Sequence, residues 1–162
     1  MNKYQENYKK GTEYQDYIVS QMLQRGFPIC LYSSRKYQYE RGESANGIEI
    51  KYDAKMAETG NIYIETAEKS DAANAYYVKS SVMRMDNTWA YLIGDYHEAF
   101  LLSVRQLRRV STWPSTKKKQ CGVQDRETPT SQGYTIPKDG EFMRKWLCIN
   151  HFIFEEVQQN VR

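Results

Sequence analysis

Residues 43–53 read Glu-Ser-Ala-Asn-Gly-Ile-Glu-Ile-Lys-Tyr-Asp, and this stretch decides the fold we expect. Within it, residues 48–53 alternate apolar and polar side chains with a period of two, which is typical of a β-strand with one buried face. Asn46-Gly47 stands immediately before the alternation, a pair that favours a tight hairpin turn. The pattern therefore predicts a strand over residues 48–53 that forms a hairpin with the residues before the turn.

Three charged side chains of this stretch are the candidate chemical groups. Residues two apart in a strand point to the same face, so Glu49 and Lys51 project together, roughly 6–7 Å apart. Glu43 lies across the turn, where a hairpin would bring its carboxylate back towards Glu49. Two adjacent carboxylates repel each other unless a cation joins them. Taken alone, Glu-x-Lys is also what an ordinary amphipathic edge strand with a surface ion pair would show.

A divalent cation would satisfy this arrangement. Mg²⁺ takes hard oxygen ligands, and Glu43, Glu49, the backbone carbonyl of Ile50 and waters would supply them. Lys51 would then hold or deprotonate the water that attacks a phosphodiester, or stabilise the charge that develops on phosphorus. The stretch thus predicts metal-assisted hydrolysis of a phosphodiester.

The rest of the chain predicts one domain, residues 1–162, with helices and strands in α/β order. A helix is expected from Thr12, with Gln15 completing a capping box, to Gly26. Further strands are expected at 29–32, 36–40, 61–66, 89–93 and 99–104, with helices at 71–82 and at 104–110, the latter capped by Ser103. The core would span about residues 10–105, followed by a basic loop at 111–133 and C-terminal strand and helix elements at 134–162, namely a strand at 134–137 and helices at 141–146 and 152–160.

The spacing Glu43-x5-Glu49-x-Lys51, after a helix that carries Glu13, resembles the PD-(D/E)xK nuclease superfamily. Within it, the chain is most similar to small phage or prophage proteins and to Holliday-junction resolvases, over about residues 10–105. The resemblance implies a restriction-endonuclease-like α/β fold, with a central mixed β-sheet flanked by helices. It also implies hydrolysis of DNA by a site that uses Mg²⁺, with Mn²⁺ as a possible substitute.

The resemblance assigns roles to individual residues. Glu49 and Lys51 match the (D/E)xK positions, and Glu43 matches the upstream acidic residue, which is usually aspartate; Glu40 is the alternative for that role. Glu13 matches a helical glutamate that reaches the metal through water in resolvases, although a first-turn glutamate is also favoured by the helix dipole alone. Two further acidic residues rank below these as site candidates. Asp53 lies on the same strand face as Glu49 and Lys51, and Glu65 lies on the next expected strand.

Composition narrows the class of protein. The chain has 162 residues, 40% of them hydrophobic and 27% charged, and no apolar run long enough for a membrane span. Its start lacks the apolar segment of a secretory signal. The three cysteines are widely spaced, which favours a reducing compartment over a disulfide framework. We therefore expect a cytoplasmic protein of a bacterium or a phage-infected cell.

Charge is concentrated in one segment. Residues 103–126 carry seven basic side chains and one acidic one, whereas the rest of the chain is nearly neutral. Such a segment suits contacts to a DNA backbone, although a solvated loop without a partner would look the same. Trp113, within the segment, would either stack on a base or dock onto the protein. The candidate phosphate contacts are Arg105, Arg108, Arg109, Lys117, Lys118 and Lys119.

Together these features predict a Mg²⁺-dependent endodeoxyribonuclease, with DNA as its partner. Cutting two strands requires two active sites, so a homodimer is expected. The alternative is a non-catalytic nucleic-acid-binding protein that retains the nuclease fold. A third interpretation is a phage protein that binds another protein through its tyrosines, of which the chain has 14.

Overall fold

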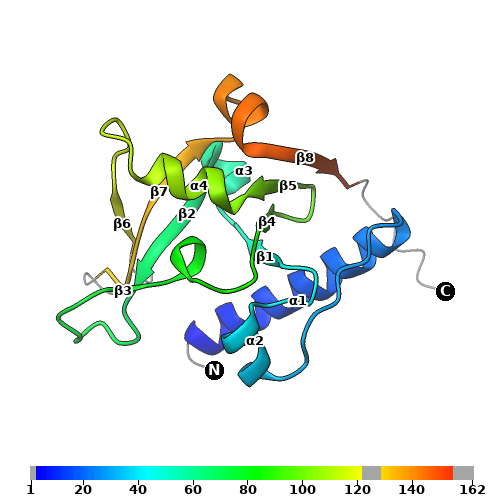
Figure 1. The fold of residues 1–162 in the computed structure, drawn as a ribbon, viewed down its shortest axis with the longest axis horizontal. Helices are drawn as coiled ribbons and strands as arrows, with labels where there is room; N and C mark the ends of the chain where they lie inside the picture. Colours follow the sequence, from blue (N-terminus) through cyan, green and yellow to red (C-terminus); the bar gives the residue numbers. More distant parts are fainter. Residues whose placement is uncertain (1–2, 122–128, 155–162) are drawn as a thin grey trace.

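The computed structural model describes residues 3–121 and 129–154 and forms two four-stranded sheets with helices around them (Figure 1). The helices are α1 Lys3–Gln24, α2 Arg35–Arg41, α3 Met56–Thr59 and α4 Val104–Ser111, with a 3-10 turn at Ser81–Met83 and a π-helical turn at Met143–Leu147. The strands are β1 Ile48–Tyr52, β2 Asn61–Glu68, β3 Val78–Lys79, β4 Ala90–Gly94, β5 Glu98–Ser103, β6 Lys119–Cys121, β7 Ser131–Pro137 and β8 Cys148–Ile153.

The first sheet is mixed and has the order β1-β4-β5-β8. Strand β1 pairs in parallel with β4, from Ile48 opposite Ala90 to Tyr52 opposite Gly94, and the other pairs are antiparallel. The second sheet has the order β3-β2-β7-β6 and is antiparallel throughout. The expectation of a mixed sheet flanked by helices is therefore confirmed at this coarser level. Strand β1 lies at an edge of its sheet, and this placement decides what the candidate site can reach.

Each face of the first sheet packs on a different layer. On one face, the apolar side chains of β1 and β4 pack against the stripe Tyr14, Ile18 and Met22 of α1. On the other face, Tyr91 and Ile93 of β4 pack towards the second sheet and α4. Figure 1 shows α1 running below the first sheet and the second sheet standing to the left. Glu49 and Lys51 alternate with the residues that face α1, so their side chains belong to the layer between the two sheets.

Several predicted elements are confirmed. Strand β1 falls within 48–53, strands occupy most of 61–66, 89–93, 99–104 and 134–137, and Ser103 caps α4 by accepting a hydrogen bond from the N–H of Gln106. Gly26 ends the first helix region with a positive φ of 73°. The π-helical turn and the residues before it account for the helix expected at 141–146.

Other predictions are wrong. Helix α1 begins before Thr12, whose hydroxyl donates to the carbonyl of Tyr8, so there is no capping box there. Residues 36–40 belong to helix α2 and not to a strand. Residues 29–32 form no strand, since only Leu31 makes an isolated bridge, to Ser44. The segment 71–82 is no helix, because the Asp71 carboxylate accepts from the N–H of Ala73 in a local turn and β3 follows.

The C-terminal part also differs from expectation. Residues 148–153 form β8, where a helix from residue 152 was predicted, and the rest of that predicted helix lies outside the described residues. The expected basic loop at 111–133 contains β6 and the first residues of β7. Within the described residues, no helix is long and apolar enough to cross a membrane.

Candidate functional site

A short turn between α2 and β1 sets the position of Glu43. The hydroxyl of Ser44 accepts from the N–H of Ile48 at 2.8 Å and donates to its carbonyl at 2.7 Å, which closes the turn. Gly42 and Gly47 flank this segment with positive φ angles of 91° and 69°. The turn expected at Asn46-Gly47 is therefore present, but the hairpin is not, because β1 pairs with the distant strand β4.

The turn nevertheless brings the Glu43 carboxylate to the edge of β1. Its Oε2 accepts a hydrogen bond from the backbone N–H of Ile50 at 2.5 Å. Its Oε1 accepts from the side-chain amide of Gln15 in α1. Glu43 is thus held between the edge strand and the long helix.

Glu49 and Lys51 form an ion pair on the face between the two sheets. The Nζ of Lys51 lies 2.6 Å from Oε1 of Glu49, and the Glu49 side chain is only 7% exposed whereas that of Lys51 is 41% exposed. A buried carboxylate is costly unless it is paired, so the lysine compensates the glutamate. The two residues expected to act together are therefore in direct contact.

The ionisation of these groups is coupled. Burial raises the pKa of Glu43 to about 7, although Lys51 and the N–H of Ile50 pull it down, and the nearby Glu49 charge raises it further. Burial lowers the pKa of Lys51, but the charges of Glu49, Tyr91 and Glu43 and the hydrogen bond to Glu49 together outweigh burial, so the pKa of Lys51 lies above its usual value. Lys51 therefore stays protonated near neutral pH, while Glu43 is poised to change its charge there.

The Glu43 pKa has a consequence for stability that can be measured. Because its pKa is higher in the folded than in the unfolded chain, the folded state holds this proton more tightly between about pH 4.5 and pH 7. We expect the free energy of unfolding to fall as pH rises through that window, by up to about 3 kcal/mol. Urea denaturation in EDTA at pH 5 and pH 8 measures it. Glu43→Gln, which cannot ionise, should show a smaller fall, and an equal fall would contradict the assignment.

The carbonyl of Ile50 faces the same side as Glu43. Along a strand, the N–H and carbonyl of one residue point to the same edge, and those of the next residue point to the opposite edge. The N–H of Asp53 donates to Gly94 of β4, so it points into the sheet. The N–H of Ile50 donates to Glu43, so it points to the open edge. By this alternation the Ile50 carbonyl also points to the open edge of β1. Two of the three oxygen donors proposed for a cation, the Glu43 carboxylate and the Ile50 carbonyl, thus lie at the open edge of β1, whereas the Glu49 carboxylate projects into the layer between the sheets.

A cavity of about 230 Å³ lies beside Lys51, lined also by Glu65, Ser81 and Tyr91. Ser81 has φ of 49°, the one positive value among the described residues other than glycine, and its hydroxyl lies 2.9 Å from the Tyr91 hydroxyl. Burial raises the pKa of Tyr91, so its phenol stays protonated. Residues held at strained backbone angles cluster at active sites and ligand clamps.

Two further acidic residues lie near this cavity. Glu65 accepts hydrogen bonds from the hydroxyls of Ser80 and Ser131, both at 2.7 Å. The pKa of Glu68 is raised, first by burial and then by the negative charge of Glu65. The positive charge of Lys51 opposes this rise. Glu68 was not predicted as a site residue. A bulge between Glu65 and Ala67 puts Glu65 and Glu68 on one face, and the alternation of the sequence gives no sign of it.

Asp53 has a local structural task. Its two carboxylate oxygens accept from the backbone N–H groups of Lys55 and Tyr63, at 3.1 and 3.0 Å. These bonds tie the end of β1 to α3 and β2. Asp53 also lines the cavity beside Lys51.

The structure does not bring Glu13 or Glu40 close to Glu43, Glu49 and Lys51. Glu13 is exposed and lies 3.7 Å from Lys9, and Gln15, two positions along α1, projects about 200° away from it, towards Glu43. Glu40 is exposed on α2, so Glu43 is the upstream carboxylate that reaches β1. Gln15 was missed as a site residue, although it is a polar residue spaced three and seven positions before the buried Ile18 and Met22.

The basic segment is divided by the fold. Arg108 donates to the backbone carbonyls of Val82 and Arg84, so it holds α4 against the 3-10 turn. Arg105 and Arg109 are exposed on α4, as are the lysines at 117–119. Lys117 and Lys119 line a second, open cavity of about 400 Å³. Trp113 and Phe142 also line this cavity, and their ring centres are 5.2 Å apart. The exposed arginines and lysines remain candidates for phosphate contacts.

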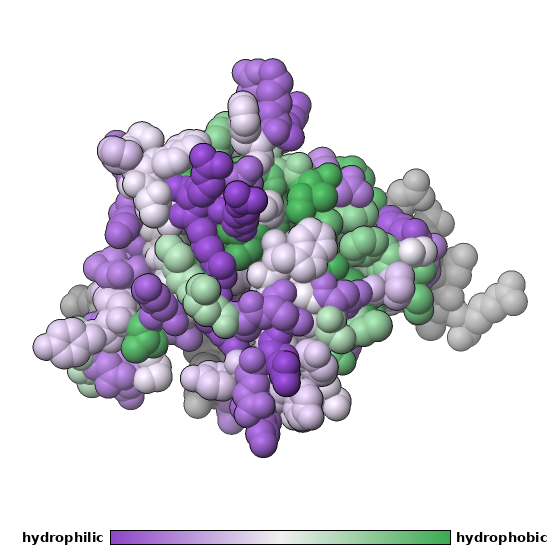
Figure 2. All heavy atoms as spheres, in the orientation of Figure 1, coloured by the Kyte–Doolittle hydropathy of each residue, from purple (hydrophilic) through white to green (hydrophobic). Residues whose placement is uncertain are grey.

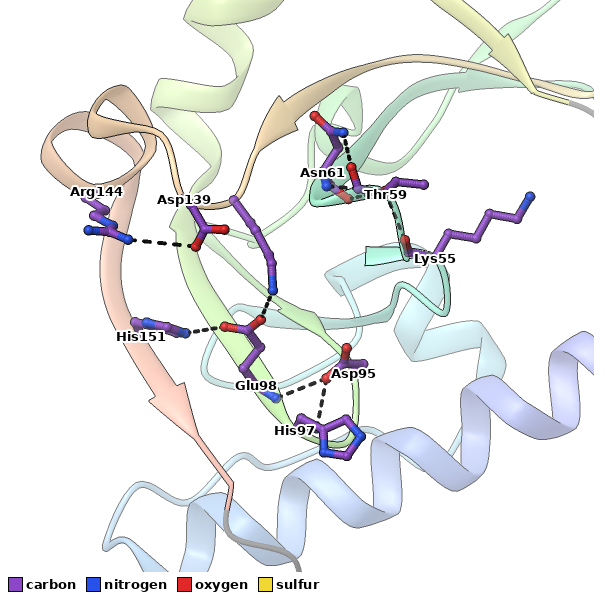
Figure 3. A network of polar contacts seen from close by, with 10 residues as sticks. Lys55, Thr59, Asn61, Asp95, His97, Glu98, Asp139, Arg144 and His151 are labelled. Atoms are coloured by element: carbon purple, nitrogen blue, oxygen red, sulfur yellow. Dashed lines mark hydrogen bonds and ion pairs between the residues drawn. The ribbon is translucent and has the colours of Figure 1, made fainter. Parts of the chain in front are cut away.

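A separate polar network joins the two sheets away from these carboxylates (Figure 3). Glu98 of β5 accepts from Lys138, which follows β7, and lies 2.7 Å from the Nε2 of His151 in β8. Burial raises the pKa of Glu98, but its hydrogen bonds to Lys138 and His151 outweigh burial and lower it. The His151 ring stacks on Phe100 at 4.1 Å. The Glu98 carboxylate thus has two basic partners, one on each side, which indicates a structural role.

No protein-family model, curated protein or solved structure matches the chain. The chemistry of the site is therefore inferred from its own residues.

Proposed function

We propose that the protein is a metal-dependent endodeoxyribonuclease whose active site contains Glu43, Glu49 and Lys51. The observation that carries the proposal is the contact between Lys51 and the buried Glu49, with the Glu43 carboxylate clamped to the same strand. A restriction-endonuclease-like arrangement and a homodimer with two such sites belong to the same proposal.

The donor set suits a hard divalent cation. Mg²⁺ is usually held by one or two carboxylates with waters completing its coordination, and Glu43, Glu49 and the Ile50 carbonyl would hold it here. When bound, the cation would supply a more acidic water and would neutralise charge on the phosphate. Mn²⁺ prefers similar ligands and would substitute.

The residues of the chain define the remaining roles. Because its pKa is raised, Lys51 acts as a positive charge that orients the attacking water and stabilises the phosphate in the transition state, and not as a general base. The amide of Gln15 fixes the Glu43 carboxylate. Among the cavity groups, the protonated Tyr91 and Ser81 are available to hydrogen-bond a phosphate oxygen.

A second candidate function is non-catalytic DNA binding. One observation favours it: no three His, Cys, Asp or Glu side chains in the described part of the chain gather as a metal-binding group. Cleavage assays separate the two functions.

The deciding experiment incubates the purified protein with plasmid, forked and four-way-junction DNA in Mg²⁺, in Mn²⁺ and in EDTA. We expect cleavage in both metals, none in EDTA and none with Glu49→Gln. Glu58→Gln, which changes an exposed glutamate on α3, is the matched control and should cleave normally. Binding without cleavage in either metal would favour the second candidate.

For the basic segment, we expect a triple replacement of Lys117, Lys118 and Lys119 by glutamine to weaken DNA binding. Each lost phosphate contact releases one counterion fewer, so the slope of log K against log salt should flatten by about one to three. Titrations at several salt concentrations measure it. A double variant of Lys55 and Lys145, two exposed lysines elsewhere, should leave the slope unchanged. An unchanged slope in the triple variant would make the segment a solvated surface.

A further inference from the structure

The second cavity, of about 400 Å³, lies between the end of α4, the chain that follows α4 and strand β7. Its apolar lining includes Val110, Tyr134 and Ile136, each at most 6% exposed. The Tyr134 hydroxyl donates to the carbonyl of Leu107 at 2.6 Å, so this phenol is already satisfied and presents an apolar ring. Cavities that bind small ligands are typically about 300–1,000 Å³ and mostly apolar, and this cavity fits both criteria.

Trp113 is held at this cavity by a braced turn. Its N–H donates to the carbonyl of Val110 at 3.1 Å, and its carbonyl accepts from the N–H of Thr116 at 3.0 Å. The hydroxyl of Thr116 also donates to the Val110 carbonyl, at 2.6 Å. The Trp113 ring packs on that of Phe142, and yet the residue is 43% exposed. Trp113 therefore docks onto the protein and still offers ring surface, so a flat ligand can stack on it without first ordering it.

The charged side chains at this cavity are both positive. Lys117 and Lys119 line it and are exposed, and among the described residues that line it there is no carboxylate. Figure 2 shows a purple, hydrophilic surface over α4 and a paler surface over the chain that follows it, at the upper left. Uncharged polar residues also line the cavity, among them Asn61, Ser115 and Thr135. The cavity thus combines an anchored ring, an apolar lining and two ammonium groups.

This combination selects a flat ring that carries a negative charge. Unpaired nucleotides of a DNA strand have both features, because their base faces are free to stack and their phosphates attract lysines. In a duplex each base is covered by its neighbours and must first be unstacked. From this arrangement we propose that the cavity binds an unpaired DNA nucleotide, with Trp113 stacked on its base and Lys117 and Lys119 on its phosphates.

The inference names a class of DNA substrate, and in that respect it rests on the proposed function. The second cavity shares no lining residue with the cavity beside Lys51, so its chemistry depends neither on Glu49 nor on a metal ion. Binding at the second cavity is therefore measured in EDTA, separately from cleavage.

Fluorescence anisotropy in EDTA compares a labelled oligothymidylate of about twelve nucleotides with a duplex of equal length. Trp113→Leu keeps an apolar side chain against Phe142 but removes the stacking ring, so its affinity for the single strand should fall about tenfold or more. Its affinity for the duplex should change less than about threefold, and Trp113→Phe, which keeps a ring, should bind the single strand within about threefold of the wild type. Trp146→Leu, at a tryptophan that is 66% exposed and does not line the cavity, should bind as the wild type does.

A strand without bases separates the role of the ring from that of the lysines. An abasic oligomer of equal length keeps its phosphates, so the wild type and Trp113→Leu should bind it equally. The double variant Lys117→Gln/Lys119→Gln should bind both the abasic and the normal strand more weakly, and should flatten the salt dependence of each by about one unit of slope. A loss by Trp113→Leu on the normal strand alone would assign the ring to the base.

Several results would overturn the inference. These are equal affinity of the wild type and Trp113→Leu for the normal strand, an equal loss by a folded Trp113→Leu on the abasic and normal strands, and no binding of the strand by the wild type, which would favour a protein partner. Displacement of the strand by thymidine monophosphate at equal nucleotide concentration would assign the cavity to a free nucleotide instead. Ring-independent binding with intact metal-dependent cleavage would remove this role of the cavity and leave the nuclease. Ring-dependent binding by a protein that cuts no DNA would remove the nuclease and leave the cavity.

Discussion

Replacing Lys51 with methionine is expected to lower DNA cleavage by about a thousandfold or more. The ammonium group is the positive charge in contact with Glu49, and loss of a group that stabilises transition-state charge typically costs two to three orders of magnitude or more. Methionine keeps most of the volume of the side chain, so the cavity beside it stays filled. Single-turnover nicking of a supercoiled plasmid in Mg²⁺ measures the change.

The same replacement leaves Glu49 buried without its partner, which destabilises a fold by about 3–5 kcal/mol in comparable cases. The double variant Glu49→Gln/Lys51→Met removes that unpaired charge, and we expect it to be better folded and equally inactive. Lys55→Met, an exposed lysine just before α3, is the matched control and should cleave normally. Substantial cleavage by a folded Lys51→Met protein would contradict the proposed role of the lysine.

Replacing Gly47 with alanine is expected to destabilise the protein by about 2–4 kcal/mol, and to lower the melting temperature by roughly 5–15 °C. Its φ of 69° is one that residues with a Cβ adopt at a cost, and a Cβ there would lie 2.6 Å from the carbonyl oxygen of Asn87. This neighbour is backbone and cannot rotate away. The turn that carries Glu43 would have to shift, so cleavage should fall as well. Thermal and urea denaturation measure the stability.

Gly11→Ala is the matched control for that variant. Gly11 lies inside α1, where an added Cβ meets no atom within 4 Å. Alanine in a helix interior is favoured over glycine by roughly 0.5–1 kcal/mol, so this variant should be more stable than the wild type. A Gly47→Ala protein as stable as Gly11→Ala would show that the turn is not constrained.

The sequence predicts those parts of the candidate site that depend on residues close together in the chain. The alternation over 48–53 fixes that Glu49 and Lys51 share a face, and the structure has them in contact. The turn before β1 is likewise local, and it delivers Glu43. What local pattern cannot show is the partner of β1, because β4 lies some forty residues later and pairs in parallel. A hairpin was predicted since it is the shortest connection available to an isolated strand.

Other errors have physical causes of the same kind. The alanine-rich segment 71–82 has good helical propensity, but the Asp71 carboxylate accepts from the backbone N–H of Ala73, and Val78 and Lys79 pair with β2 as a strand. Gln15 acts through a carboxylate 28 positions away, and its spacing alone indicated a helix cap. Long-range contacts override local preference in both cases.

The hydrogen bond from Ile50 to Glu43 has a further effect on the protein in solution. Strand β1 ends its sheet, and an edge strand offers unpaired N–H and carbonyl groups on which another chain can add a strand and start aggregation. Glu43 takes up one of these N–H groups and, above about pH 7, sets a negative charge beside it. The Glu43 carboxylate, which we propose as a metal ligand, therefore also hinders pairing of the β1 edge with another chain. Variants that remove it should be judged for solubility as well as for activity.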